Sequence, residues 1–441
     1  MGCKQSKSTI DYVEQPKRSI AESSLNVIVV HYNPQRFKRR AALINECLQR
    51  LSDTRRRLQS SSEFRLNIVA VELIYENENN NPDVQFDAQD VVEMTHAIPN
   101  KSEIMQTTDN DVQIIRRTVE STQVMWSKEQ LINIAIRSLP EDEKHVAWID
   151  SDISFVDDSW VSKAIMALSK HPLAFGQLWS TCDMLGPDGE AQKGMTMTSF
   201  AQQEARGKTY VSCSNRQVED YWHPGFAWVA TMAALKKTGC LIDKTLGSAD
   251  RHMAMSFLGR ASETVPDNIH INYKSQVVEW QDRVIRHKIE LIFVPVHIMH
   301  HWHGSLHRRQ YMERWDILAR HRFDPDTHLI FNRKTDLYIW DQSCPKGLLH
   351  AVNGYFESRQ EDSLDDDDDH PTDSERNRNR YGGDDDYDEG MIKYAPSIAE
   401  SIMQGANSIV NAISEAMGES STSVIENNNH TADLSSLDFY A

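Results

Sequence analysis

The sequence contains no apolar run that approaches the ~20 residues needed to span a bilayer, and no secretory signal at its start. Its six cysteines are scattered and form no Cys-x-x-Cys pair, which speaks against a disulfide framework. The chain before residue 359 is close to neutral, so it lacks the basic face that a nucleic-acid-binding protein needs. These absences predict a protein of a reducing compartment that neither crosses a membrane nor binds nucleic acid.

Acidic charge is plentiful, but it is concentrated at one end. The formal net charge is -18, and most of it comes from residues 359–441. Blocks of aspartate and a shortage of apolar side chains predict a disordered acidic linker at 359–390. In the tail that follows, 391–441, isoleucines recur on one face of a possible amphipathic helix at 397–417. Such a narrow stripe could lie on a membrane surface or bind a protein partner. It could equally belong to a fraying helix without a binding role.

The first residues, MGCKQSKS, match the pattern for N-myristoylation after removal of Met1. Gly2 would carry the myristoyl group, and Cys3 could carry a palmitoyl group. One acyl chain binds a membrane only weakly, and a second makes the anchor stable. We therefore predict a flexible, acylated segment at 1–24 that holds the protein on the cytosolic face of a membrane. Without acylation the protein would be cytoplasmic.

Strand and helix patterns alternate through most of the remaining chain. A β-rich run at 25–34 is followed by a helical stripe and then by a second buried strand at 65–75, an order that predicts parallel strands with right-handed crossovers. Polar and chain-breaking residues at 76–121 predict a long insert. We expect one α/β domain over 25–330, a mixed sheet flanked by helices, with 331–358 as its C-terminal extension.

Two carboxylates, Asp150 and Asp152, follow the apolar strand pattern HVAWI. In an open α/β sheet, ligands bind beyond the carboxyl ends of the strands. Residues two apart on a strand project to the same face, so these acids would repel each other unless a divalent cation lay between them. Oxygen ligands suit Mg²⁺ or Mn²⁺, and such an ion would stabilise a departing nucleotide diphosphate. A simple turn is the alternative.

Two later segments carry candidate residues for an acceptor. The aromatic stretch YWHPGFAW contains His223, Gly225 and Trp228, which could form a sugar-stacking loop; core packing is the alternative and is favoured for Trp228. Asp250 stands near the start of a predicted helix over 246–259, where the helix dipole stabilises a carboxylate. It could deprotonate an acceptor hydroxyl or serve as an N-cap.

The densest histidine cluster lies in the sequence VPVHIMHHWHG. A neutral imidazole is a suitable further ligand for manganese. We expect one histidine to be the third metal ligand, with His300 and His301 ahead of His303. A separate zinc site is the alternative, although no cysteine accompanies the cluster.

In their order along the chain these motifs resemble the GT-A glycosyltransferases, above all the inverting β-1,4-galactosyltransferase-like group and its relatives. The resemblance covers roughly 25–325 without the insert at 76–121. It implies a Rossmann-like nucleotide-sugar-binding fold, hexosyltransferase-like activity with inversion, Mn²⁺ or Mg²⁺ as cofactor and a nucleotide-diphosphate donor, with a UDP-sugar favoured. The acceptor would be a glycan, a protein or a small molecule.

The resemblance also assigns roles to matching positions. It implies donor binding by His31, Tyr32, Asn33, Lys128, Asn133 and Asp150. The metal would be held by Asp150 and Asp152 with His300 or His301, and Asp250 would be the base. The stretch GSADRHM has fewer acids than the family motif, which affects acceptor recognition and the base, and the chain lacks the membrane anchor usual in the family.

Two other functions fit the same sequence. A nucleotidyltransferase shares the nucleotide-binding sheet and the metal-binding carboxylates. A membrane-tethered interaction protein could keep an inactive transferase fold and act through its tails.

Overall fold

The computed structural model describes residues 23–61, 63–76, 103–104, 112–208, 210, 222–304 and 311–362. Several predictions concern residues outside these ranges. The acylation sites Gly2 and Cys3, the acidic linker beyond 362 and the amphipathic helix at 397–417 lie outside the described residues. Within the described ranges, no helix is long and apolar enough to cross a membrane.

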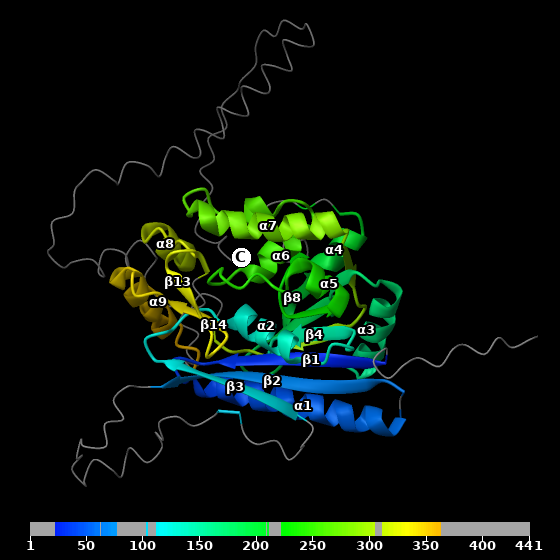
Figure 1. Cartoon of the computed structure of the whole chain (residues 1–441). Coiled ribbons are helices and arrows are strands. Elements are labelled where there is room, and N and C mark those ends of the chain that lie inside the picture. Colours follow the sequence, from blue (N-terminus) through cyan, green and yellow to red (C-terminus); the bar gives the residue numbers. More distant parts are fainter. Residues whose placement is uncertain are drawn as a thin grey trace, which may run out of the picture. The chain divides into compact units, whose positions relative to one another are not determined.

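The described chain is built around a seven-stranded mixed sheet with helices on both faces (Figure 1). The strand order is β11-β6-β10-β4-β1-β2-β3. The strands are β1 (Ser24–Tyr32), β2 (Arg65–Glu76), β3 (Val112–Glu120), β4 (His145–Ile149), β6 (Ala174–Gln177), β10 (Ala227–Thr231) and β11 (Glu290–Phe293). β1 runs parallel to β2 and β4, whereas β10 runs antiparallel to β4 and β6. The predicted α/β class, a mixed sheet flanked by helices, is confirmed.

Strand β1 carries the apolar run 27–30 because both of its faces are covered. Leu25, Val27 and Val29 belong to the core that also contains Ile44 and Leu48 of helix α1 (Lys38–Ser61). The alternate residue Ile28 packs in a second core on the other face of the sheet, with helix α2 (Lys128–Ser138). Strands of parallel sheets that are buried on both faces have such continuous apolar runs.

The segment predicted as a polar insert at 76–121 ends in a strand. Residues 112–120 form β3, which pairs in parallel with β2 at the edge of the sheet. All residues of β3 except Val119 are partly buried or exposed, and two arginines interrupt its apolar residues. A strand with one neighbour and a solvated face needs no long apolar run, so its sequence is not distinguished from a loop.

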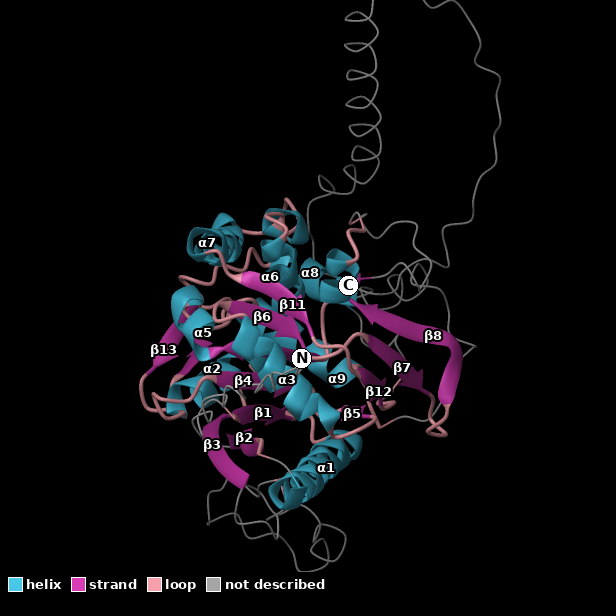
Figure 2. Cartoon of the chain, turned by 90° about the vertical axis from the view of Figure 1, so that its right-hand side faces the viewer, coloured by secondary structure: helices cyan, strands magenta, loops and turns pink. Residues whose placement is uncertain are grey.

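A smaller, five-stranded sheet has the order β5-β12-β7-β8-β9 (Figure 2). Its strands are β5 (Ile153–Phe155), β7 (Thr181–Leu185), β8 (Ala191–Ser199), β9 (Trp222–His223) and β12 (His297–His300). β12 pairs antiparallel with β5, and His300 stands opposite Ile153 in that pairing. This register carries a histidine from late in the chain to the residue that follows Asp152.

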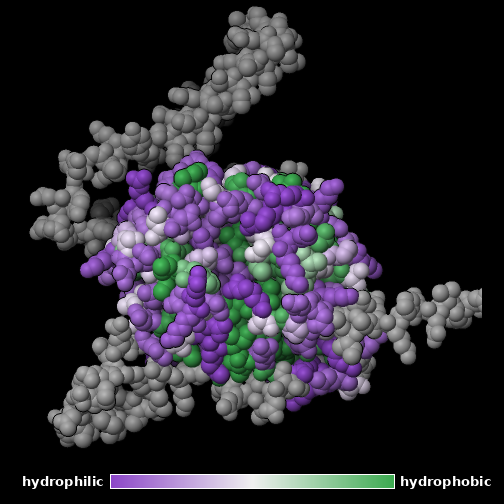
Figure 3. Space-filling model, viewed as in Figure 1, coloured by the Kyte–Doolittle hydropathy of each residue, from purple (hydrophilic) through white to green (hydrophobic). Residues whose placement is uncertain are grey.

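The remaining elements cover the sheets. They are α3 (Ser159–Lys170), α4 (Phe200–Ala205), α5 (Met232–Thr238), α6 (Ala249–Phe257), the 3-10 helix η4 (Ala261–Thr264), α7 (Ile271–His287), α8 (Tyr311–Arg320), the hairpin β13 (Leu329–Asn332) and β14 (Leu337–Trp340), and α9 (Lys346–Ser358). The hairpin contacts α2, and α9 contacts α8, so the predicted extension at 331–358 packs on the domain. Polar residues dominate the face in Figure 3, and hydrophobic residues are visible between them.

His252 is a buried histidine in α6 whose ring is held on both sides. Its Nδ1 lies 2.5 Å from Thr264 Oγ1, and its Nε2 lies 3.0 Å from Tyr273 Oη. Burial, together with the charges of Arg251 and Arg314, lowers the pKa of His252 to about 3. The ring is therefore neutral in the folded protein at every pH at which the protein is expected to work.

His252 should make the stability of the fold depend on pH. The unfolded chain, with a histidine pKa of about 6.5, binds more protons than the folded one between about pH 6.5 and the lowered pKa. The free energy of unfolding should therefore fall as pH decreases through that window, by up to about 1.4 kcal/mol per pH unit. Denaturant titrations at pH 7 and pH 5 measure this fall, and His252→Gln should show a smaller one. An equal fall in both proteins would mean that other groups cause the acid sensitivity.

Candidate active site

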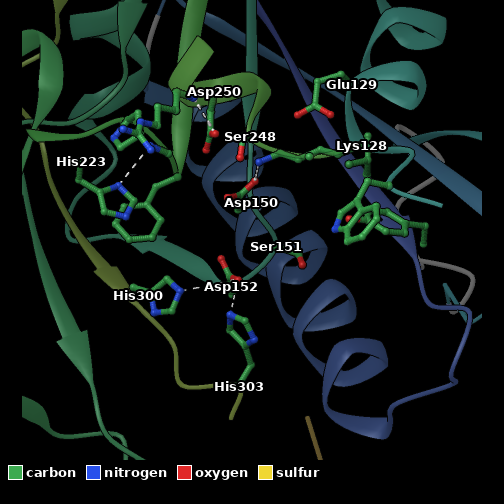
Figure 4. Close-up of a pocket in the computed structure, with 18 of the residues that line it drawn as sticks. Lys128, Glu129, Asp150, Ser151, Asp152, His223, Ser248, Asp250, His300 and His303 are labelled. Carbon is green, nitrogen blue, oxygen red and sulfur yellow. Dashed lines mark hydrogen bonds and ion pairs between the residues drawn. The ribbon is translucent and has the colours of Figure 1, made fainter. Parts of the chain in front are cut away.

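A cavity of about 250 Å³ opens beyond the carboxyl ends of β1 and β4 (Figure 4). It lies where the sequence predicted a ligand site, at the strand ends of an open α/β sheet. Most of its lining is polar or ionisable. The ionisable side chains are Tyr32, Arg40, Lys128, Glu129, Asp150, Asp152, His223, Asp250, Arg251, His300, His303, Arg314 and Arg359.

Asp152, His300 and His303 form a compact cluster on one side of the cavity. Their ligand atoms all lie within 4.8 Å of one another. The Oδ2 atom of Asp152 is 2.9 Å from His303 Nε2 and 3.7 Å from His300 Nε2. Both histidines are buried, because β12 pairs with β5 and brings its end next to Asp152.

The donor atoms of this cluster suit a divalent metal ion. A carboxylate oxygen and two imidazole nitrogens converge, and the carboxylate compensates part of the charge of a bound cation. Imidazole is a better ligand for transition metals than for magnesium, so the set favours Mn²⁺ over Mg²⁺. Three protein ligands would leave further coordination positions for oxygens of a substrate.

The carboxylates of Asp150 and Asp152 have different partners. The Oδ1 atom of Asp150 lies 2.5 Å from Lys128 Nζ, whereas Asp152 faces the two histidines. The rule that residues two apart share a face applies within a strand, but β4 ends at Ile149 and the chain turns at Ser151. The turn directs the Asp150 carboxylate toward Lys128 and the Asp152 carboxylate toward the histidines. The structure therefore does not bring the two carboxylates together as the sequence predicted.

His301 lies outside the cluster as well. Its Nε2 is 2.9 Å from Ser154 Oγ, and its backbone N–H donates to the carbonyl oxygen of Asp152. Neighbouring residues of an extended chain point to opposite faces, so His300 and His301 cannot both face the cavity. His303, which the sequence ranked third, occupies the second imidazole position.

Lys128 is surrounded by carboxylates. It forms the ion pair with Asp150, and Asp250 and Glu129 also act on its charge. Burial alone would lower the pKa of Lys128, but the three acids outweigh it and raise the pKa, so the ammonium group stays charged. Lys128 is the first residue of α2. Ser127 precedes it as the N-cap residue but makes no side-chain cap, since its hydroxyl donates to Met125 O.

Asp250 belongs to the first turn of α6 and lines the cavity. Ser248 precedes the helix as its N-cap residue, in the left-handed conformation, so Asp250 is not the N-cap. The Oδ1 atom of Asp250 accepts a hydrogen bond from the Arg251 backbone N–H at 2.8 Å. A Cβ atom on Gly225 would come within 3.0 Å of Asp250 Oδ2. Gly225 therefore gives the carboxylate the space to reach the cavity.

The aromatic segment divides between the cavity and the core. His223 lines the cavity, and its ring stacks on Phe226 at 4.0 Å between centroids. Trp228 lies in β10, is 2% exposed and stacks on Trp148 of β4. Trp228 therefore packs in the core, the alternative that the sequence favoured.

The other expected donor-binding residues also divide. Tyr32 lines the cavity, but His31 and Asn33 turn to the other side of β1, where both contact the Glu103 carboxylate. Asn133 is buried in α2 and exchanges two hydrogen bonds with the backbone of Leu241. These three side chains hold neighbouring segments of the fold and do not line the cavity.

Sequence reasoning missed part of the cavity wall. Local patterns did not mark its further ionisable residues, which are Arg40, Glu129, Arg251, Arg314 and Arg359. Glu129 and Arg251 are adjacent in sequence to predicted site residues, whereas the other three come from distant segments. Arg314 reaches over Gly247, where a side chain would collide with it, and its guanidinium lies over the Trp126 ring. Gly247 also has a positive φ of 104°, which suits glycine.

The last described residues, 359–362, form what we call the C-terminal strap. Glu361 is 3% exposed and forms a bidentate ion pair with Arg40 of α1. Arg359 Nε lies 2.7 Å from the same carboxylate. Burial opposes ionisation, but the two arginines lower the pKa of Glu361. Asp362 accepts from the backbone N–H groups of Lys38 and Arg39, at the start of α1. The predicted acidic linker at 359–390 therefore begins with residues that pack on the domain.

Comparison with known proteins gives structural likenesses only. No family model matches the sequence, and no curated protein is similar to it at a significant level. One similar structure is a Drosophila β1,4-galactosyltransferase 7 solved with manganese, UDP-Gal and xylobiose; identity is 9%, the TM-score is 0.31, and the match covers 75% of this chain and 98% of the other.

Two further structures are similar at the same level. A mannosyltransferase from Pyrobaculum calidifontis, in complex with GDP-Man and Mn²⁺, has 13% identity and a TM-score of 0.32. The match covers 76% of this chain and 72% of the mannosyltransferase. A 4-diphosphocytidyl-2C-methyl-D-erythritol synthase from Anaerococcus prevotii has 13% identity and a TM-score of 0.29. The match covers 63% of this chain and 88% of the synthase. Two of these three are glycosyltransferases, the class that the sequence motifs resemble.

Proposed function

We propose that this chain is a metal-dependent glycosyltransferase of the GT-A type, which moves a sugar from a nucleotide-diphosphate donor to an acceptor hydroxyl. One observation carries the proposal. A single cavity at the strand ends combines the cluster of Asp152, His300 and His303 with a separate carboxylate, Asp250. Sugar transfer needs both parts, because charge must be stabilised on the leaving diphosphate while a proton is removed from the acceptor.

The donor end of the cavity would be the metal cluster. Asp152, His300 and His303 would hold Mn²⁺, and Mg²⁺ is the weaker alternative. A divalent cation bound there supplies positive charge that stabilises the diphosphate leaving group. Arg40 and Arg359 line the same cavity and already bind a carboxylate, that of Glu361. Their guanidinium groups would add positive charge near the phosphates.

The acceptor end would be the region around Asp250. The carboxylate of Asp250 lies next to Gly225, where the absence of a side chain lets it reach the cavity, and its charge acts on the Lys128 ammonium. Asp250 would take the proton of the acceptor hydroxyl as that oxygen attacks the anomeric carbon. Attack from the side opposite to the leaving group gives a product with inverted configuration, which is the stereochemistry that we propose.

The finer assignments are also proposals. Among donors we favour a UDP-sugar, with a hexose as the transferred unit and a glycan, a protein or a small molecule as acceptor. The motif around Gly2 and Cys3 supports acylation and a position on the cytosolic face of a membrane. His223 and Gly225, at the cavity, are candidates for contact with the acceptor.

A screen of sugar nucleotides tests the proposal directly. The full-length protein with Mn²⁺ should slowly hydrolyse at least one UDP- or GDP-sugar and release the nucleoside diphosphate, and EDTA should stop the reaction. Water replaces the acceptor in this assay, so no acceptor has to be known. Release of pyrophosphate from nucleoside triphosphates would identify a nucleotidyltransferase instead. A protein that neither binds nor cleaves any of these nucleotides would support the non-enzymatic alternative.

A further inference from the structure

Glu129 is a buried carboxylate that the proposed chemistry leaves without a task. It is the second residue of α2, is 8% exposed and lines the cavity beside Lys128. Figure 4 shows its carboxylate pointing into the cavity, in the region of Lys128, Ser248 and Asp250. Within the described ranges, no other side chain forms a hydrogen bond or an ion pair with the Glu129 carboxylate. The neighbouring Lys128 ammonium is instead 2.5 Å from Asp150.

A carboxylate in this position is costly unless something binds it. Burying an ionised group without a hydrogen-bonding partner costs several kcal/mol, and buried polar groups in proteins are almost always paired. Burial, together with the charge of Asp250, raises the pKa of Glu129 to about 7, although the Lys128 ammonium opposes the shift. Within the protein, the backbone of Glu129 itself provides one hydrogen bond to this group. Further partners would have to come from whatever occupies the cavity.

The charges around Glu129 favour a neutral ligand over a cation. Lys128 already places one ammonium among Glu129, Asp150 and Asp250, and Arg251 and Arg314 also line the cavity. A carboxylate accepts hydrogen bonds through both oxygens, and hydroxyl groups are the neutral donors that suit it. A sugar ring offers several such hydroxyls on adjacent carbons. The Glu129 carboxylate would repel a diphosphate, which is also negatively charged.

We propose that Glu129 binds hydroxyl groups of the transferred sugar and thereby determines which sugar nucleotide the protein accepts. This inference rests on the proposed glycosyltransferase function. It places the sugar ring between the metal cluster, which would hold the diphosphate, and Asp250, which would face the acceptor. A site built to pair with a hydroxyl rejects an analogue that lacks it, because its own polar group is then left buried and unpaired. Glu129 would act in this way on the donor.

Glu129→Gln tests the contact because it keeps the size of the side chain while removing the charge and one acceptor oxygen. The full-length protein with Mn²⁺ is titrated calorimetrically with UDP-glucose, UDP-galactose, UDP-N-acetylglucosamine and GDP-mannose, and with UDP and GDP alone. We expect the Kd of the preferred sugar nucleotide to rise about 10-fold or more, as for loss of a hydrogen bond to a charged group. The Kd of the matching sugar-free nucleotide should stay within about twofold. Glu141→Gln, at an exposed position just after α2, is the matched control.

Deoxy-sugar nucleotides identify the hydroxyl. In the wild-type protein, the analogue that lacks the bound hydroxyl should lose as much affinity as Glu129→Gln does, and the variant should lose little more with that analogue. Equal weakening of the sugar nucleotide and the free nucleotide would overturn the inference, since it would indicate a general effect on the site. Unchanged affinities in Glu129→Gln would overturn it while leaving the glycosyltransferase proposal intact. A wild-type protein that binds none of these nucleotides would overturn both.

Discussion

Asp152→Asn should lower the rate of sugar transfer about 10³-fold or more, because it removes the negative ligand from the cluster with His300 and His303. An amide oxygen is a weak, neutral ligand and leaves a bound cation without charge compensation. The affinity for Mn²⁺ should fall at least about 100-fold. Titration of Mn²⁺ followed by electron paramagnetic resonance measures this without any substrate, and turnover of a sugar nucleotide measures the rate.

The control for this variant is Asp142→Asn, at an exposed position in the turn before β4. It makes the same chemical change outside the cavity and should leave both Mn²⁺ affinity and turnover at wild-type values. If Asp152→Asn bound Mn²⁺ as tightly as the wild-type protein, the cluster would not be the metal site. His303→Ala should weaken Mn²⁺ binding as well, whereas His301→Ala should not, because His301 is bound to Ser154.

Asp250→Asn should leave donor binding near the wild-type level and reduce transfer by about 10²–10⁴-fold, the usual contribution of a general base. The amide keeps the shape of the side chain and its place across Gly225, but it cannot accept the proton of the acceptor hydroxyl. Single-turnover measurements with saturating donor separate this chemical step from binding.

The control variant for Asp250→Asn is Asp282→Asn, at an exposed position of α7. It should transfer sugar at the wild-type rate. Normal turnover by Asp250→Asn would remove Asp250 from the role of base. A parallel loss of donor affinity would instead mean that Asp250 mainly positions the donor, since its charge also acts on Lys128.

The central part of the fold follows from local sequence patterns. Both β1 and β2 are continuous apolar runs, and the helical stripe between them forms α1, so their predicted parallel pairing is confirmed. Such patterns report how deeply a segment is buried, and the core strands are buried on both faces. Strand β3 gave no such signal because it lies at the edge of the sheet, where alternate residues can be polar.

The cavity could be predicted only in outline. Asp150, Asp152, Asp250 and His300 all line it, as the ordered motifs indicated. The division of labour between the two aspartates depends on a turn at Ser151 that periodicity does not reveal. The choice of His303 over His301 depends on the path of the chain after β12. Contacts of this kind join residues far apart in the sequence, so no local pattern encodes them.

The C-terminal strap has a consequence for how the protein is made. The ion pair of Arg40 with Glu361 joins residues separated by 321 positions, and Asp362 completes the first turn of α1. Translation proceeds from the N-terminus at about 5–20 residues per second, so the sheet can fold well before these partners leave the ribosome. A nascent polypeptide, or one shortened by a premature stop codon ahead of residue 359, would have the strands and helices but an unfinished cavity wall. The cavity wall would thus be completed only after residues 359–362 have been made.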